Sequence, residues 1–88
     1  MIVIKRDGHE EQFKKDKVYK SVYESCLNAH HNKKNASNMA KKVINDLIKE
    51  LKGKKKTTTD EIFKLISTLI ENYDADAAFL YETHRDVS

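Results

Sequence analysis

The chain contains no proline, no tryptophan, two glycines and a single cysteine among its 88 residues. With Cys26 alone, an internal disulfide and a zinc site built from several cysteines are excluded, and a cytoplasmic location is the default expectation. No apolar run approaches the roughly 18 residues that a membrane-spanning helix needs. The first residues also lack the apolar core of a secretory signal. We therefore expect a folded cytoplasmic protein with no membrane contact.

Length and charge narrow the class further. Eighty-eight residues suffice for one small core, so we expect a single domain spanning residues 1–88, and a two-domain enzyme is excluded. Seventeen basic residues oppose fourteen acidic ones, and the two arginines are Arg6 and Arg85. Lysine is a mobile point charge, whereas arginine supplies the planar fork that reads guanine and phosphate. Nucleic acid is therefore disfavoured as the main partner.

The N-terminal residues predict a β-hairpin. The β-branched stretch Ile2–Ile4 is followed by Asp7–Gly8, a dipeptide typical of a two-residue turn, and residues 10–13 can return as a second strand. An apolar stripe at spacings of three and four then predicts a helix over roughly residues 15–30. The polar stretch from Asn28 to Asn38 is expected to be a loop.

Three further helices are expected. A second apolar stripe runs from Met39 to Leu51 and is ended by Gly53. The connector after it contains threonines that could add a short third strand. Thr58 and Glu61 have the spacing of a capping box for a third helix, and Asp74 can cap a fourth helix that reaches about residue 85. The expected fold is α+β and mostly α: a four-helix bundle capped by an N-terminal β-hairpin or a small three-stranded sheet.

Signals for catalysis or metal binding are weak. The chain has no glycine-rich phosphate loop, no Gly-x-Ser-x-Gly elbow and no His-Glu-x-x-His motif. Cys26 falls on an apolar stripe, which favours a buried thiol over a nucleophile. The adjacent His30 and His31 have no carboxylate or cysteine at ligand spacing, so we expect surface histidines. The lysine run Lys52–Lys56 is expected to be a solvated connector, although it could also grip phosphate.

The hairpin and the third helix together favour an anion site. Lys5 and Arg6 precede the turn, Glu11 follows it, and Lys17 opens the first helix. The expected helix start at Thr58–Thr59 would offer backbone N–H groups suited to an anion. These groups could form a nucleotide pocket, with the cations and the helix end on phosphates and the carboxylate on a base or sugar. The alternative is a set of surface charges flanking a turn.

The same residues carry a resemblance to a known family. Val3–Gly8, followed by Glu11, Phe13 and Lys17–Val18, resembles the opening signature of the ATP-cone, V-x-K-R-D-G-x-x-E-x-F-x-x-x-K-[IV]. The stretch Thr58–Ile62 is similar to the opening of the family's third helix. The ATP-cone is the regulatory nucleotide-binding domain of many ribonucleotide reductase large subunits, and it also occurs in a bacterial repressor of reductase genes. The resemblance covers nearly the whole chain and implies a four-helix bundle under a small sheet.

The resemblance implies roles for several residues of the hairpin and the first helix. Lys5 and Arg6 would hold phosphates, and Val3 would contribute backbone beside the nucleotide. Glu11 and Lys17 would define the base and sugar end of the site. The binding site implied by the resemblance therefore lies mainly on the N-terminal hairpin.

The remaining implied contacts include one match and several departures. Thr59 would meet the ligand at the start of the third helix. Lys14 stands where the family usually has Asp or Asn, and Phe63 stands where some reductases carry a phosphate-contacting histidine. The family's C-terminal cation would correspond to His84 or Arg85, and the register of the last helix leaves this choice open.

The function that the resemblance implies is allosteric and not enzymatic. ATP or dATP, with or without Mg²⁺, would bind as an effector and regulate a ribonucleotide reductase or a similar partner, or would change self-association. The chain would be a free-standing cone or one excised from a reductase. The lack of a preceding four-cysteine zinc ribbon argues against the repressor. The alternative is a small helical interaction module with weak nonspecific nucleic-acid binding.

Overall fold

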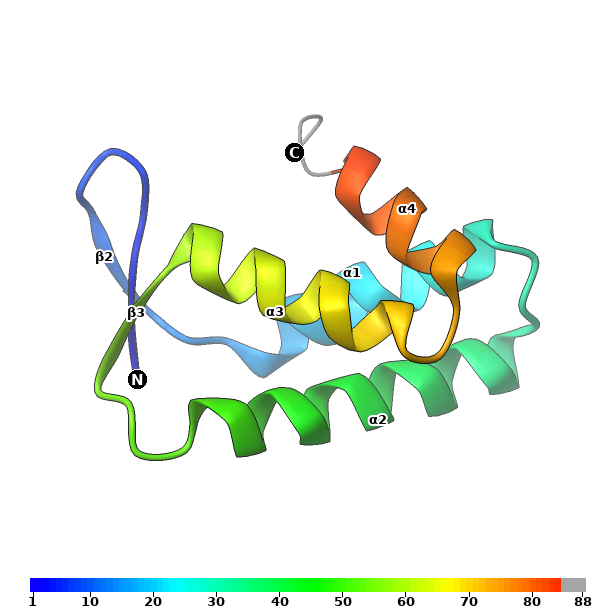
Figure 1. The fold of residues 1–88 in the computed structure, drawn as a ribbon, viewed down its shortest axis with the longest axis horizontal. Coiled ribbons are helices and arrows are strands. Elements are labelled where there is room, and N and C mark those ends of the chain that lie inside the picture. The colour runs from blue at the N-terminus through cyan, green and yellow to red at the C-terminus, as the bar shows by residue number, and fades with distance from the viewer. Residues whose placement is uncertain (85–88) are drawn as a thin grey trace.

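The computed structural model describes residues 1–84, which form a small sheet at one end of a set of helices (Figure 1). The elements in chain order are β1 (Ile2–Ile4), β2 (Glu10–Gln12), α1 (Lys15–Asn28), α2 (Lys33–Leu51), β3 (Lys56–Thr58), α3 (Thr59–Glu71) and α4 (Ala75–His84). This architecture confirms the expected α+β class with mostly helical content, and the three-stranded form of the sheet. Within this part of the chain, no helix is both long and apolar enough to cross a bilayer.

The sheet has the order β2-β1-β3, with β1 in the centre. β2 pairs antiparallel with β1 and places Glu11 opposite Val3. β3 pairs parallel with β1 and places Thr57 opposite Val3, while Thr58 lies opposite Ile4. Because α3 begins directly after β3, this parallel pairing brings the start of α3 to the end of β1, where the hairpin turn begins.

The hairpin turn differs from the expected two-residue form. The N–H of Lys5 donates to the carbonyl of His9 at 2.8 Å, and the N–H of Gly8 donates back to the carbonyl of Lys5 at 2.9 Å. Gly8 has a φ of +91°. A mirror-image two-residue turn would also need a positive φ at Asp7, but within residues 1–84 the one non-glycine residue with a positive φ is His30. The loop is therefore a three-residue turn that ends in a left-handed glycine.

The expected loop over residues 28–38 is wrong, because α2 begins at Lys33. The side chain of Asn32 accepts the N–H of Asn35 at 2.8 Å and caps the helix. Ala36 is fully buried and extends the apolar stripe of α2 toward its N-terminus. Polar side chains in this segment occupy the exposed face of the helix, and the small Ala36 gives little sign of a buried face, so the segment has the composition of a loop.

The expected helix caps on α3 and α4 are confirmed. The Thr58 hydroxyl accepts the N–H of Glu61 at 3.1 Å, and the Thr57 hydroxyl donates to the Glu61 carboxylate at 2.7 Å. The Thr57 hydrogen bond is the main reason why the pKa of Glu61 lies below its usual range. Asp74 accepts the N–H of Asp76 at 2.9 Å at the start of α4. Both helix starts are thus set by local sequence.

The hydrophobic core lies between the helices. Its largest fully buried side chains come from α1, α2 and α3: Leu47, Ile66, Ile70, Val22, Val43 and Cys26. Burial raises the pKa of the Cys26 thiol to about 11, so the thiolate is scarce at neutral pH. The expectation that this cysteine is a buried core residue is confirmed.

A contact between His31 and Asp74 connects the α1–α2 loop to the α3–α4 turn. The Nε2 atom of His31 contacts Oδ2 of Asp74, and both side chains are largely buried. His31 is therefore not the surface histidine that the sequence suggested. The pKa of Asp74 lies below its ordinary value. The hydrogen bond from His31 is the largest cause, and the backbone amides of Ala77 and Asp76 also lower it.

Asp74→Ala is expected to lower the free energy of unfolding by about 1–2 kcal/mol at pH 7, because a helix cap and the partner of His31 are lost together. The lowered pKa means that this stabilisation is present above pH 4 and disappears as the pH falls further. Urea denaturation at pH 7 and pH 3 measures both values. Asp74→Asn is the control, since it keeps a capping oxygen. An equal deficit for Asp74→Ala at both pH values would contradict this account.

Candidate functional site

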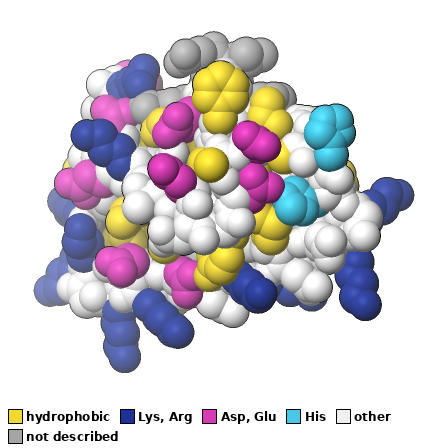
Figure 2. Space-filling model, turned by 45° about the vertical axis from the view of Figure 1, so that its right-hand side comes forward, with side chains coloured by type: hydrophobic (Ala, Val, Ile, Leu, Met, Phe, Trp, Pro, Cys, Tyr) yellow, Lys and Arg dark blue, Asp and Glu magenta, His cyan; other side chains and the backbone are white. Residues whose placement is uncertain are grey.

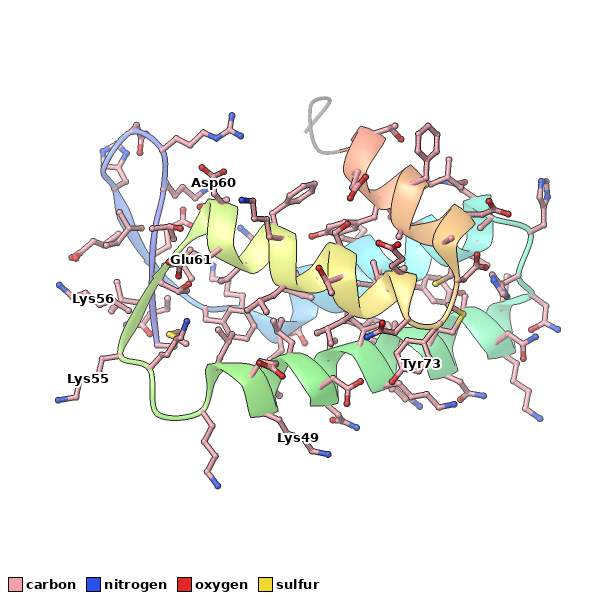
Figure 3. All side chains as sticks on the ribbon, in the orientation of Figure 1. Lys49, Lys55, Lys56, Asp60, Glu61 and Tyr73 are labelled. Atoms are coloured by element: carbon pink, nitrogen blue, oxygen red, sulfur yellow. The ribbon has the colours of Figure 1, made fainter. Side chains whose placement is uncertain are left out.

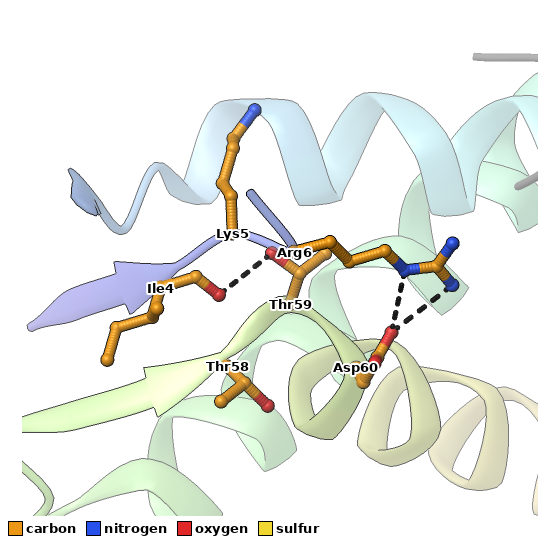
Figure 4. A pocket seen from close by; sticks show the side chains of 6 residues that line it. All are labelled: Ile4, Lys5, Arg6, Thr58, Thr59 and Asp60. Carbon is orange, nitrogen blue, oxygen red and sulfur yellow. Dashed lines mark hydrogen bonds and ion pairs between the residues drawn. The ribbon is translucent and has the colours of Figure 1, made fainter. Parts of the chain in front are cut away.

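A pocket of about 160 Å³ lies where the hairpin meets the N-terminus of α3 (Figure 4). Its lining comes from the end of β1, the start of the turn and the junction between β3 and α3: Ile4, Lys5, Arg6, Thr58, Thr59 and Asp60. The pocket thus joins segments that are more than fifty residues apart in sequence, as the Arg6–Asp60 separation of 54 shows.

Arg6 and Asp60 face each other across this pocket. The Nε and Nη2 atoms of Arg6 each lie 3.4 Å from Oδ1 of Asp60. Both side chains are well exposed, at 68% for Arg6 and 57% for Asp60. An exposed ion pair contributes little to stability, typically about 0–1 kcal/mol. The guanidinium is therefore held in place weakly and is accessible to an incoming anion.

Lys5 extends away from the Arg6–Asp60 pair (Figure 4). Its Nζ lies 3.4 Å from a carboxylate oxygen of Glu11 across the hairpin, and both side chains are about half exposed. Glu11 therefore neutralises Lys5 in this structure. The two cations on the hairpin are each paired with one carboxylate.

Thr59 ties α3 to the central strand. Its hydroxyl donates to the carbonyl of Ile4 at 3.3 Å (Figure 4). Thr58 caps the helix, and the first turn of α3 opens beside Arg6. The N-terminus of a helix carries a partial positive charge and attracts anions. The pocket therefore combines a guanidinium and a helix N-terminus with the carboxylate of Asp60, while the Lys5 ammonium points away from the Arg6–Asp60 pair and contacts Glu11.

The structure brings some of the sequence-predicted site residues together and leaves others apart. Lys5, Arg6 and Thr59 line the same pocket. Val3 precedes the pocket residue Ile4 on the central strand, between Glu11 on β2 and Thr57 on β3. Glu11 does not line the pocket but forms an ion pair with Lys5, which does. Lys17 is exposed in the first turn of α1 and is not among the residues that line the pocket.

The candidates for a C-terminal cation lie outside what the structure describes. Arg85 follows the last described residue, and the side chain of His84 is not described. Within residues 1–84, no group of three or more His, Cys, Asp or Glu side chains could hold a metal ion.

Two pocket residues were not identified from the sequence, Ile4 and Asp60. Thr58 belongs to the helix start that was expected to offer N–H groups to an anion, and it lines the pocket. Ile4 and Asp60 are the direct sequence neighbours of the predicted residues Lys5 and Thr59. The parallel pairing of β1 with β3, which determines the contact, has no local signal in the sequence.

The lysine run beyond α2 projects into solvent. Lys55 and Lys56 point outward from the β3 end of the molecule, and Lys49 points outward from α2 (Figure 3). Lys56 lies 3.5 Å from Glu10 on β2. All of the lysines in this run are exposed, as expected of a solvated connector.

Another face of the molecule is acidic and apolar. Figure 2 shows acidic and hydrophobic side chains interleaved at its centre, while most lysines and arginines lie toward the edges. Two exposed aromatic residues of the described chain are Phe79 and Tyr73. The Tyr73 hydroxyl donates to Asp46 at 2.6 Å, which raises the pKa of Tyr73. This face offers no broad basic surface of the kind that nucleic acid would select.

The fold is a small α+β domain with a pocket between a β-hairpin and a helix N-terminus. The family model for the ATP cone domain matches residues 1–87, essentially the entire chain. The chain therefore belongs to the ATP-cone family, whose members are regulatory, non-catalytic nucleotide-binding domains with ATP or dATP as effectors. No curated protein sequence matches the chain significantly.

Proposed function

We propose that this chain binds ATP or dATP in the pocket between the hairpin and α3 and acts as a non-catalytic allosteric sensor of adenine nucleotides. The observation that carries the proposal is that Lys5, Arg6 and the first turn of α3 line one pocket, within a chain that belongs to the ATP-cone family. Charge-assisted hydrogen bonds from such groups are the strong contacts for phosphate oxygens. The phosphates would therefore occupy the pocket.

The size of the pocket supports a site that holds the phosphates and leaves the base and sugar outside it. Pockets that enclose a whole small molecule usually measure about 300–1,000 Å³, whereas this one measures about 160 Å³. It suits the phosphate groups, which Arg6, Lys5 and Thr59 would hold. The base and sugar would extend along the hairpin, where Val3, Glu11 and Lys17 are the proposed contacts. Mg²⁺ would arrive, if at all, with the nucleotide phosphates.

Calorimetric titration with ATP, dATP and GTP tests the proposal. We expect micromolar dissociation constants for the adenine nucleotides, about −8 kcal/mol in free energy, and weaker binding of GTP. A single-stranded oligonucleotide titrated at two salt concentrations tests the alternative interaction module. Binding of all polyanions at millimolar level, with a steep salt dependence, would contradict a nucleotide sensor and favour that module.

The regulatory output is proposed to be a change in association. A ligand can shift an equilibrium only by its differential affinity for two states, so a domain without catalytic groups reports nucleotide by presenting different surfaces. The partner would be the catalytic part of a ribonucleotide reductase or a second copy of this chain, in the cytoplasm. Sedimentation velocity without ligand, with ATP and with dATP measures self-association. One unchanged species in all three would contradict regulation through a second copy.

Gly8→Val is expected to abolish nucleotide binding by distorting the hairpin turn. At the Gly8 φ of +91°, a β-branched side chain is strained, although nothing lies within 4 Å of the added Cβ. The strain falls on the turn that holds Arg6. Gly53→Val is the matched control, because Gly53 has a φ of +88° and lies outside the pocket.

Calorimetry with ATP and thermal denaturation of both glycine variants separate the two effects. We expect similar losses of stability, about 1 kcal/mol or more, but a loss of affinity for Gly8→Val alone. Normal affinity in the Gly8→Val variant would contradict the assigned role of the turn.

A further inference from the structure

Asp60 is the feature of the pocket that the proposed function does not explain. A phosphate site gains from cations and amides, yet here a carboxylate lies at the first turn of α3 with Oδ1 3.4 Å from two nitrogens of Arg6. Phosphate oxygens would seek the same guanidinium N–H groups. A nucleotide and Asp60 therefore compete for Arg6.

The position of this ion pair gives the competition a structural consequence. Arg6 belongs to the hairpin turn and Asp60 belongs to α3, so their contact fastens one element to the other across the pocket (Figure 4). The Lys5–Glu11 pair, in contrast, lies within the hairpin. A second contact also joins the two elements, because the Thr59 hydroxyl donates to the Ile4 carbonyl at 3.3 Å.

We propose that Asp60 is an internal competitor for phosphate, and that nucleotide binding replaces the Asp60 carboxylate on Arg6 and so releases the hairpin turn from α3. This inference rests on the proposed function and adds a residue that tunes affinity and couples binding to movement. The exposed pair is weak enough to be displaced. The bond between Thr59 and Ile4 remains as the point about which the turn moves.

The competition predicts that removal of the carboxylate strengthens binding. Asp60→Asn keeps the size of the side chain and removes its charge, so ATP no longer has to displace an ion pair to reach Arg6. We expect an increase in ATP affinity of about three- to fivefold at low salt. Glu10→Gln is the matched control, because Glu10 pairs with Lys56 on the sheet and not with a pocket residue. It should change affinity less than twofold.

A double-mutant cycle with Arg6 distinguishes competition from general repulsion. If Asp60 acts through Arg6, the gain from Asp60→Asn largely disappears when Arg6 is already alanine. A gain that persists in the Arg6→Ala background would come from repulsion between the carboxylate and the phosphates and would overturn the competition. Calorimetry with ATP, with and without Mg²⁺, on the unmodified chain, Asp60→Asn, Arg6→Ala, the double variant and Glu10→Gln provides all of these comparisons.

The outcomes separate this inference from the proposed function. Tighter binding in Asp60→Asn that is lost in the double variant supports the competition. Binding by the unmodified chain with unchanged or weaker affinity in Asp60→Asn would overturn the inference alone. If Asp60→Asn binds ATP more weakly only when Mg²⁺ is present, Asp60 is a metal ligand, and this result would also overturn the inference. Absence of ATP binding in both chains would overturn the proposed function and the inference together.

Discussion

Replacing Arg6 with alanine is expected to weaken ATP binding by about 10- to 100-fold while leaving the thermal unfolding temperature nearly unchanged. A charge-assisted hydrogen bond to phosphate contributes about 1.5–3 kcal/mol, and the fork of arginine can make two. The stability of the domain depends little on this side chain, because Arg6 and its partner Asp60 are both exposed. Calorimetry with ATP and thermal denaturation measure the two quantities.

Two further variants show whether the loss of ATP affinity is specific to residues that line the pocket. Lys5→Ala is expected to behave in the same way, since Lys5 lines the same pocket. Lys55→Ala removes an equal charge from an exposed connector outside the pocket and should leave affinity within about twofold. Unchanged affinity in both Lys5→Ala and Arg6→Ala would remove the phosphate role from the hairpin.

Leu47→Ala is expected to lower the free energy of unfolding by about 2–5 kcal/mol, the largest stability effect that we predict. Leu47 is among the largest fully buried side chains of residues 1–84 and lies on the core face of α2. The loss combines the transfer free energy of the removed atoms with the cavity that they leave. Because small domains are only marginally stable, the unfolding temperature should fall by about 10–30 °C.

The neighbouring Ile48 provides the control for this prediction. Its side chain is 41% exposed, so Ile48→Ala removes atoms that are already partly in water. We expect a loss of less than about 1 kcal/mol. Urea denaturation followed by circular dichroism measures both variants. Equal losses for the two substitutions would contradict the assignment of the core face of α2.

The features of the fold that could be predicted from the sequence are those with local causes. The apolar stripes predicted the first three helices, and the Asp74 cap predicted the fourth. The hydroxyl of Thr58 and the carboxylate of Asp74 also predicted the starts of α3 and α4 to the residue. The start of α2 was missed because its first buried position is Ala36, which is too small to stand out in a polar stretch. An apolar stripe thus predicts the start of a helix only where the first buried residues are large.

The candidate site was predictable only in part. Lys5, Arg6 and Thr59 were identified because the hairpin and the helix start each have a local signal, and the structure places them on one pocket. The partnership of Arg6 with Asp60 could not be predicted, since it depends on the parallel pairing of β1 with β3 across 54 residues. The length of the turn also escaped prediction, because Asp7–Gly8 fits turns of two or three residues.

The most direct test of the proposed site is a titration of the isotope-labelled protein with ATP, followed by amide chemical shifts in NMR spectra. An adenine-nucleotide site at the pocket predicts that the largest shifts occur over residues 4–6 and 58–60, with small shifts over residues 75–83 of α4. Arg6→Ala should require a higher ATP concentration for the same shifts. Largest shifts in the lysine run over residues 52–56, with residues 4–6 unmoved, would contradict the site and the sensor function assigned to it.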